Sequence, residues 1–253
     1  MRNFYLLLIG CAFISCNNNN ASKYPGICLS FDDRSVDEWF QLRELFNKNS
    51  VKVTFFITQP DSLNSAEVNK LKQLEQDGHE IGFHGNMHIS PRQYIKEYSY
   101  ADYMDNEINK GMRTMDSLGF NCVSFAYPYG AEYWFTDFLL LKKFDLLRDI
   151  SSLKGEKDLT KMDGIYYSFN GDRTLSAIGI DVISGVNESM INKALQRAVN
   201  NKEVLLLYGH RPTDSKEAKG YSTKIELLNH IIRKAKENNM KFYTMKELKM
   251  KEN

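Results

Sequence analysis

Two short groups of metal-binding side chains stand about fifty residues apart in this sequence. Asp32 and Asp33 follow an apolar run, and His84 and His88 are four positions apart. Carboxylate oxygens and imidazole nitrogens are ordinary ligands of divalent metals. One carboxylate and two imidazoles would bind such an ion and leave the second carboxylate free as a base. The pattern therefore predicts a metal-dependent hydrolase.

Alternating strand-like and helix-like segments must position these side chains. The apolar runs and the helical periodicity predict strands at 27–31, 51–57, 80–83, 123–126, 145–147, 165–169, 177–183, 204–208 and 241–244, and helices at 36–47, 66–77, 103–118, 135–143, 188–200 and 223–238. This alternation predicts right-handed crossovers and an α/β fold with a mostly parallel sheet, closed here into a distorted (β/α) barrel.

The candidate residues all follow predicted strands. The aspartate pair, the histidine pair, Pro128–Gly130 and His210 each come directly after an apolar run. Because loops from several parallel strands converge at the carboxyl edge of the sheet, we expect these groups to share one mouth.

Length and composition are compatible with one large domain. The chain has 253 residues, of which 42% are hydrophobic and 12% aromatic. This is enough to bury one core of barrel size. A net charge of +1, with acids and bases interspersed, gives no basic surface for nucleic acid. We therefore predict one domain over residues 24–253 and no nucleic-acid partner.

The first residues differ from the rest. Residues 1–16 combine a positively charged start, an apolar run over 4–14 and a small residue before Cys16. This segment resembles a bacterial lipoprotein signal, with lipidation at Cys16 and a polar tether over 17–23. Cys11 also fits the usual pattern, but cleavage there would leave a short apolar stretch. An ordinary secretory signal or an N-terminal anchor is the alternative, and each version places the mature protein outside the cytoplasm. The lipoprotein version anchors it in the bacterial cell envelope, on the periplasmic or outer face.

Two cysteines remain in the predicted domain. Cys28 and Cys122 could pair in an oxidising compartment. Both lie in apolar strand-like runs, so we expect two buried free thiols.

Four ordered motifs resemble those of the polysaccharide deacetylases, the NodB-homology domain of carbohydrate esterase family four. They are Ser30-Phe31-Asp32-Asp33, His84-x-x-x-His88, Phe125-Ala126-Tyr127-Pro128-Tyr129-Gly130 and Leu205-Leu206-Leu207-Tyr208-Gly209-His210. The resemblance extends over about residues 24–248, nearly all of the predicted domain. It implies a distorted (β/α) barrel, a divalent metal, commonly zinc, and hydrolysis of acetyl groups from sugars.

The resemblance also implies a role for each matching residue. Asp33, His84 and His88 would be the metal ligands, and Asp32 the general base for the attacking water. Such a site would also suit cobalt, nickel or iron.

The last two motifs would complete the reaction. The backbone N–H of Tyr129 would stabilise the oxyanion, and His210 would protonate the departing amine or alkoxide. Leu205–Leu207 would form a small apolar pocket for the acetyl methyl.

Three positions depart from the family pattern. Arg34 replaces the usual glycine, and Gly85 replaces the usual serine or threonine. Ala126 replaces the arginine that usually braces the base. We predict that Arg148, at the end of the next strand, contacts the base instead, and that Asp181 orients the acid histidine.

Other aromatic and histidine side chains have simpler interpretations. Tyrosines within 94–103 are expected to pack in the fold, although they could form a subsite wall. Tyr133 and Trp134 are better placed as a sugar platform. His79 and His230 are expected to be structural.

These observations predict a metal-dependent carbohydrate N-deacetylase acting on an acetylated oligo- or polysaccharide. An O-acetyl esterase is the alternative within enzymes, because ester and amide hydrolysis use the same groups. A glycan-binding lipoprotein that retains the metal site without catalysis is the alternative from another class.

Overall fold

The computed structural model describes residues 24–250. The predicted signal at 1–16, both candidate lipidation sites and the tether at 17–23 lie outside the described residues. No helix between residues 24 and 250 is long and apolar enough to cross a membrane.

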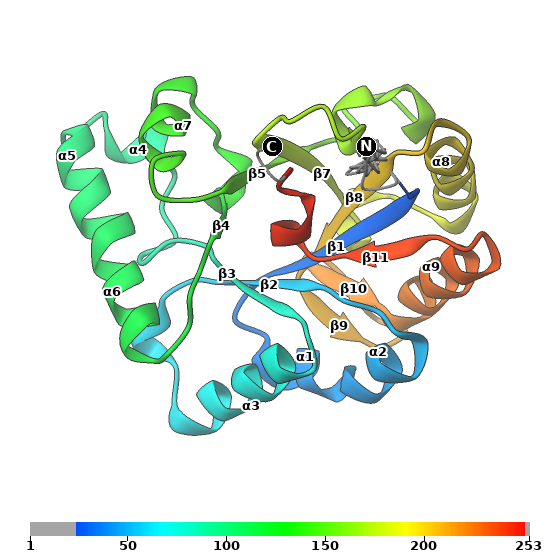
Figure 1. The fold of residues 1–253 in the computed structure, drawn as a ribbon, viewed down its shortest axis with the longest axis horizontal. Helices are drawn as coiled ribbons and strands as arrows, with labels where there is room; N and C mark the ends of the chain where they lie inside the picture. The colour runs from blue at the N-terminus through cyan, green and yellow to red at the C-terminus, as the bar shows by residue number, and fades with distance from the viewer. Residues whose placement is uncertain (1–23, 251–253) are drawn as a thin grey trace, which may run out of the picture.

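Seven parallel strands close into a barrel at the centre of the molecule (Figure 1). They are β1 (Gly26–Asp33), β2 (Thr54–Ile57), β3 (Glu80–Phe83), β4 (Ser124–Ala126), β5 (Leu146–Ser151), β7 (Thr174–Gly179) and β8 (Val204–Gly209). Neighbours pair in that order, and β8 pairs with β1 to close the ring, with Gly26 opposite Val204. The contact between β3 and β4 is narrow, with Phe83 opposite Phe125. The predicted distorted (β/α) barrel is confirmed.

Two further strands share edges with barrel strands. Strand β11 (Lys241–Tyr243) lies parallel to the first half of β1, whose second half pairs with β2. The short β6 (Tyr166–Tyr167) runs antiparallel to the start of β8. Strands β9 (Arg211–Thr213) and β10 (Ser222–Lys224), which the sequence did not predict, form a separate pair after β8.

Helices surround the strands (Figure 1). They are α1 (Val36–Gln41), α2 (Arg43–Asn49), α3 (Ser65–Gln76), α4 (Pro91–Tyr94), α5 (Tyr100–Tyr103), α6 (Lys110–Ser117), α7 (Trp134–Leu140), α8 (Glu188–Asn201) and α9 (Ile225–Glu237). The predicted helix at 103–118 is interrupted by a π-helical segment, Met104–Asn109. Short 3-10 turns lie at Pro60–Ser62, Pro128–Gly130, Leu159–Lys161, Asp163–Ile165, Val182–Ser184 and Met245–Leu248.

The core has two parts because strand side chains alternate. Leu205 and Leu207 of β8 face the large cluster packed under the helices, whereas Leu206 belongs to a smaller cluster. Cys28 and Cys122 are buried and free, as predicted.

The predicted strand at 177–183 was wrong in its bounds. Strand β7 spans Thr174–Gly179 and a 3-10 turn follows at Val182–Ser184. The apolar residues Val182 and Ile183 continue the strand pattern but are 36% and 61% exposed. Asp181 therefore lies in the loop after the strand, where it can face the barrel mouth.

Candidate metal-dependent active site

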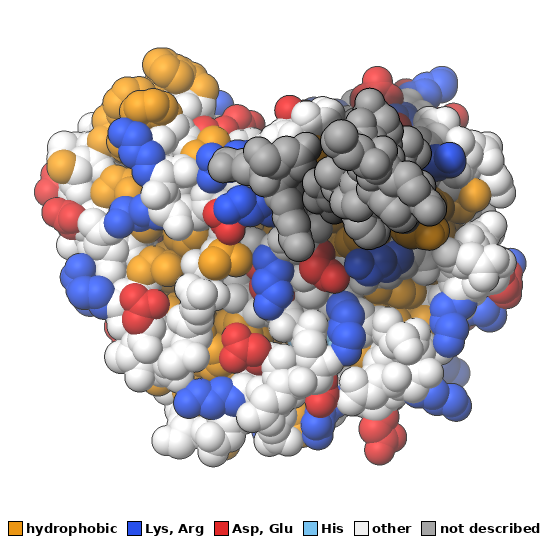
Figure 2. Space-filling model, in the orientation of Figure 1, with side chains coloured by type: hydrophobic (Ala, Val, Ile, Leu, Met, Phe, Trp, Pro, Cys, Tyr) orange, Lys and Arg blue, Asp and Glu red, His pale blue; other side chains and the backbone are white. Residues whose placement is uncertain are grey.

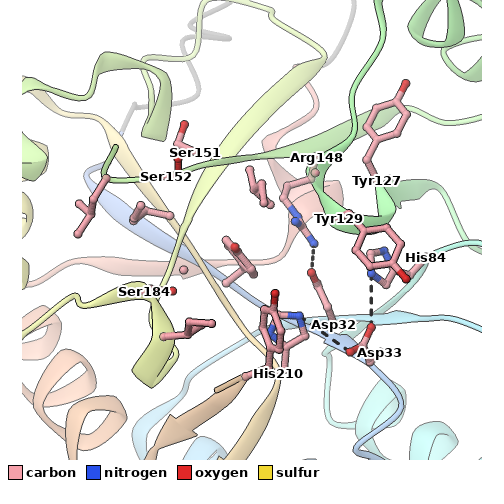
Figure 3. A pocket seen from close by; sticks show the side chains of 18 of the residues that line it. Asp32, Asp33, His84, Tyr127, Tyr129, Arg148, Ser151, Ser152, Ser184 and His210 are labelled. Atoms are coloured by element: carbon pink, nitrogen blue, oxygen red, sulfur yellow. Dashed lines mark hydrogen bonds and ion pairs between the residues drawn. The ribbon is translucent and has the colours of Figure 1, made fainter. Parts of the chain in front are cut away.

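The carboxyl ends of the barrel strands open into a cavity of about 480 Å³ (Figure 3). Its lining includes the aspartates that end β1, the histidines that follow β3, Tyr129 after β4, Arg148 on β5 and His210 after β8. The prediction that these groups share one mouth is confirmed.

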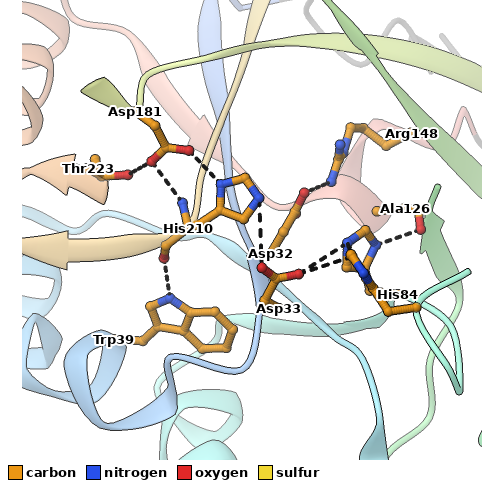
Figure 4. Close-up of polar contacts among 10 residues, drawn as sticks. Asp32, Asp33, Trp39, His84, Ala126, Arg148, Asp181, His210 and Thr223 are labelled. Carbon is orange, nitrogen blue, oxygen red and sulfur yellow. Dashed lines mark hydrogen bonds and ion pairs between the residues drawn. The ribbon is translucent and has the colours of Figure 1, made fainter. Parts of the chain in front are cut away.

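Asp33, His84 and His88 form a compact set of possible metal ligands. One ligand atom of each lies within 4.8 Å of the others. The Asp33 Oδ1 atom is 3.6 Å from His84 Nε2 and 3.3 Å from His88 Nε2. The His84 Nδ1–H can donate to the backbone carbonyl of Ala126 at 2.8 Å, which leaves Nε2 free toward the cavity (Figure 4).

The polar atoms of this set fit a divalent cation. Asp33 Oδ1 is buried and has no hydrogen-bond donor. Such an atom costs free energy unless a donor or a cation satisfies it. Two inward imidazole nitrogens and a carboxylate oxygen match the ligands of a catalytic site that keeps an open coordination position.

The local charges favour ligation at both kinds of residue. Burial opposes ionisation of Asp33, but contact with His88 and the nearby imidazoles of His84 and His210 lower its pKa to about 2. Burial lowers the pKa of His84 to about 4, although the adjacent aspartates oppose that shift. The aspartate is therefore anionic and His84 neutral near pH 7, and these are the forms that bind metal.

Three residues at this mouth have left-handed backbone conformations. The φ angles are 79° at Asp33, 57° at His88 and 61° at Tyr129. Such conformations are uncommon for residues other than glycine and often occur at functional sites. The surrounding structure must hold these residues in place.

Asp32 and Arg148 form a buried ion pair beside the metal cluster. Arg148 Nη2 donates to Asp32 Oδ2, and both side chains are buried. Ala126 on β4 lies opposite Arg148 on β5, so the arginine reaches Asp32 from the strand next to Ala126. The predicted contact between Arg148 and Asp32 is present (Figure 4).

Aromatic rings support the guanidinium. Its central carbon lies 5.4 Å from the ring of Phe56 and 5.0 Å from the ring of Tyr208. These cation–π contacts help to accommodate a buried arginine.

His210 is held on the opposite side of the cavity by three polar contacts. Its Nδ1 is 2.5 Å from Asp181 Oδ2, and its backbone N–H donates to Asp181 Oδ1 at 3.1 Å. The third contact is with Trp39, whose indole donates to the His210 carbonyl at 2.8 Å. Asp181 is itself held by Thr223, which donates to Asp181 Oδ1. The predicted contact between Asp181 and His210 is therefore present.

This arrangement favours a protonated His210. Burial alone would lower the pKa of His210, but the hydrogen bond to Asp181 and the charges of Asp32, Asp181 and Asp33 outweigh it and raise the pKa. Its Nε2 lies 3.9 Å from Asp33 Oδ2, so the ring faces the metal cluster.

The apolar wall of the cavity differs from the predicted one. Leu205–Leu207 do not line it, because their strand positions face the two core clusters. Ile150, Ile178, Ile183 and Tyr208 line it instead.

Several other aromatic side chains lie away from this cavity. Tyr103 is buried in the core, whereas Trp134 is 70% exposed and lies outside the cavity lining. Figure 2 shows hydrophobic side chains gathered near α7 at the upper left. His79 is buried, and its Nδ1 accepts from Val53 N at 3.2 Å. His230 contacts Asn192 on α8, so both histidines have structural contacts.

Sequence reasoning missed two supporting residues, Glu107 and Trp39. Glu107 is buried beneath the histidine loop, where burial raises its pKa to about 7 although the N–H groups of Ile89 and Met87 favour ionisation. For Glu107, the signal in the sequence was its position directly before Ile108, which lies on the predicted buried face of that helix.

The structure is therefore a (β/α) barrel with a possible metal site, the Asp-His-His cluster, at its carboxyl edge. The sequence profile described as polysaccharide deacetylase matches residues 19–142, which include the first three motifs. The chain belongs to the polysaccharide deacetylase family. A search of curated proteins found no match.

Solved structures share the fold. A chitin deacetylase from the fungal pathogen Colletotrichum lindemuthianum has a TM-score of 0.56 at 16% identity, covering 89% of this chain and 88% of that chain. The Xyl-CE4 domain of a multidomain xylanase from the hindgut metagenome of Trinervitermes trinervoides has a TM-score of 0.52 at 18% identity, covering 89% of each chain. The catalytic domain of a peptidoglycan N-acetylglucosamine deacetylase from Eubacterium rectale has a TM-score of 0.51 at 16% identity, covering 87% and 88%.

Proposed function

We propose that this protein is a metal-dependent hydrolase that removes N-linked acetyl groups from a glycan. The observation that carries the proposal is the convergence of the Asp33-His84-His88 cluster, the Asp32–Arg148 pair and His210 on one cavity. Amide hydrolysis requires an electrophile, a base and an acid. The cluster would hold the electrophile, Asp32 would be the base and His210 would be the acid.

The metal ion would be held by Asp33, His84 and His88, and zinc is our first choice. When bound, this ion would act as a Lewis acid toward the acetyl carbonyl. Asp32 would accept the proton of the attacking water. Arg148 would keep the Asp32 carboxylate in a fixed position, because one of its oxygens is bound to the guanidinium. The other oxygen, Oδ1, is buried without a partner and is available to the water.

Tyr129 and His210 would act on the intermediate and the leaving group. The Tyr129 backbone N–H would donate to the oxyanion. The His210 imidazolium would then donate its Nε2 proton to the sugar nitrogen, which is a very poor leaving group without it. Asp181 would hold the ring and stabilise the imidazolium through Nδ1.

The contact of His210 Nδ1 with Asp181, which holds the acid ring toward the cavity, supports N-deacetylation over the O-acetyl esterase alternative. An ester alkoxide leaves more easily than an amide nitrogen, so ester cleavage needs the acid less. The structural relatives include both chitin and peptidoglycan deacetylases and a xylanase domain, so the glycan must be identified by assay.

The decisive experiment compares acetate release from an N-acetylglucosamine oligomer and from acetylated xylan. We expect release from the oligomer that is lost with a chelator and restored by zinc or cobalt. His210→Ala should abolish amide cleavage, whereas His230→Ala, a histidine on α9 outside the cavity, should retain it. Preferential release from xylan would establish the esterase, and glycan binding without release would establish the non-catalytic alternative.

We also propose export and lipid anchoring at Cys16, as the sequence of residues 1–16 predicts. Metabolic labelling with a radioactive fatty acid should label the wild-type protein and not Cys16→Ala. Labelling lost only in Cys11→Ala would move the anchor to that position.

A further inference from the structure

The loop that carries His88 is attached to one buried carboxylate. Glu107 Oε2 accepts from Met87 N at 2.6 Å, and Glu107 Oε1 accepts from Ile89 N at 3.0 Å. The Glu107 backbone carbonyl accepts from Asn86 N at 3.0 Å. One residue therefore binds the backbone on both sides of the second histidine of the metal cluster.

The same carboxylate occupies the space beside Gly85. A Cβ atom on Gly85 would lie 2.2 Å from Glu107 Oε1, closer than real Cβ atoms approach, and the φ angle there is 88°. Gly85 directly follows His84, so Glu107 reaches the loop next to both histidine ligands. The departure of this chain from the usual serine or threonine at position 85 has a direct steric reason.

Glu107 is buried on a helical segment that faces the histidine loop. It lies inside the π-helical segment Met104–Asn109, and both Glu107 and its neighbour Ile108 are fully buried. Such π-helical insertions frequently occur at functional sites.

We propose that Glu107 is a positioning residue for the metal site, which fixes residues 86–89 so that His88 Nε2 faces Asp33. The left-handed backbone of His88, with φ 57°, needs such support because an unconstrained loop would relax to more populated conformations. The inference rests on the proposed metal ligands and is independent of deacetylation.

A role only in folding is the competing explanation. Glu80 provides a matched control, because it is also a buried glutamate whose carboxylate accepts from a backbone N–H, that of Lys246 at 2.7 Å, and from Thr54 at 3.0 Å. It lies at the start of β3, whereas the cluster follows the end of that strand. Loss of Glu80 should reduce stability without moving the histidine loop.

The test measures the zinc dissociation constant by competition with a chromophoric chelator, together with unfolding of the metal-free proteins. Glu107→Gln should weaken zinc binding by about 10–100-fold, the usual effect of removing a group that orients a ligand. Glu80→Gln should lower the midpoint of unfolding and leave the zinc dissociation constant within about twofold of wild type. Unchanged zinc binding in Glu107→Gln, or equal weakening in both variants, would overturn the positioning role.

A second variant tests the steric contact without removing the carboxylate. Gly85→Ala should displace Glu107 and weaken zinc binding. In a Glu107→Ala background the further loss should be smaller, because the steric contact is gone and only the backbone strain at φ 88° remains. Additive losses would contradict the proposed contact. If the wild-type protein bound no zinc or cobalt, the metal ligands themselves would be refuted, an outcome distinct from a failure of Glu107 alone.

Discussion

The contact between Asp181 and His210 gives the sharpest test of the acid role. Asp181 is buried, and its two carboxylate oxygens accept from the ring, from the backbone N–H of His210 and from Thr223. Asp181→Asn keeps the shape of the side chain but removes the negative charge that stabilises the imidazolium. The variant should therefore lower the pKa of His210, which Asp181 now raises above 6.5.

The size of the effect follows from the type of contact. A hydrogen bond to a charged group contributes about 1.5–3 kcal/mol, and one pKa unit corresponds to about 1.4 kcal/mol, so the shift should be about one to two units. The acid form is the protonated form and is lost as pH rises. The alkaline limb of kcat should thus move to lower pH, and the rate on that limb should fall about 10–100-fold.

The assay is a pH profile of acetate release from the N-acetylated oligomer. Thr223→Val is the matched control, because it removes one hydrogen bond to Asp181 but keeps the carboxylate charge. Its alkaline limb should move by less than one unit. An alkaline limb that stayed in place or moved to higher pH in Asp181→Asn would contradict the proposed role of Asp181, provided that the variant retains the wild-type fold by circular dichroism.

Three further predictions concern a buried ion pair, a buried histidine and a turn at the cavity. Arg148→Met leaves Asp32 buried without its cation and should lower the free energy of unfolding by about 3–5 kcal/mol in urea titrations. Adding Asp32→Asn should restore part of this loss. Equal stability of Arg148→Met and wild type would contradict the ion pair. Burial lowers the pKa of His79 from 6.5 to about 4. Between these pH values the unfolded protein binds a proton at His79 that the folded protein does not. The free energy of unfolding should therefore fall as pH decreases from 6.5 to 4, by at most about 3 kcal/mol. His79→Asn, compared with wild type in urea titrations from pH 7 to 4, should lack this part of the pH dependence, and parallel curves would rule it out. Gly130→Ala would place a Cβ atom 1.9 Å from Ile150 Cγ1 and should reduce acetate release at least tenfold. Adding Ile150→Ala should restore part of the activity. Wild-type activity in Gly130→Ala would show that the Pro128–Gly130 turn tolerates a side chain.

Much of the barrel could be predicted because its strands are short apolar runs that end in polar residues. Strand β3 has the predicted bounds, 80–83, and the bounds of the other barrel strands lie within four residues of the predicted ones. Strand β7 was predicted too far along the chain because Val182 and Ile183 extend the apolar pattern, although both are exposed and Ile183 lines the cavity. Local hydrophobicity does not distinguish an apolar residue in a core from one lining a binding site.

The convergence of the candidate residues was predictable where neighbouring residues have chemically informative types. The aspartate pair and the histidine pair stand out by type and spacing, and the structure brings them to one cavity. The contact between Arg148 and Asp32 could also be anticipated, because a missing arginine at Ala126 can be replaced from the next parallel strand. Glu107 could not be found in this way, because it contacts backbone N–H groups of the histidine loop, and the types of the residues in that loop do not reveal such contacts.

Side-chain types and local periodicity were sufficient to predict the parallel barrel, the order of the motifs and the kinds of polar side chain at the mouth. The contacts of Asp33 with two imidazoles, of Arg148 with Asp32 and of Glu107 with the histidine loop became visible only in the folded barrel. These contacts join residues distant in the chain. Their distances depend on strand register, barrel closure and backbone strain, which exist only once the ring of strands has formed.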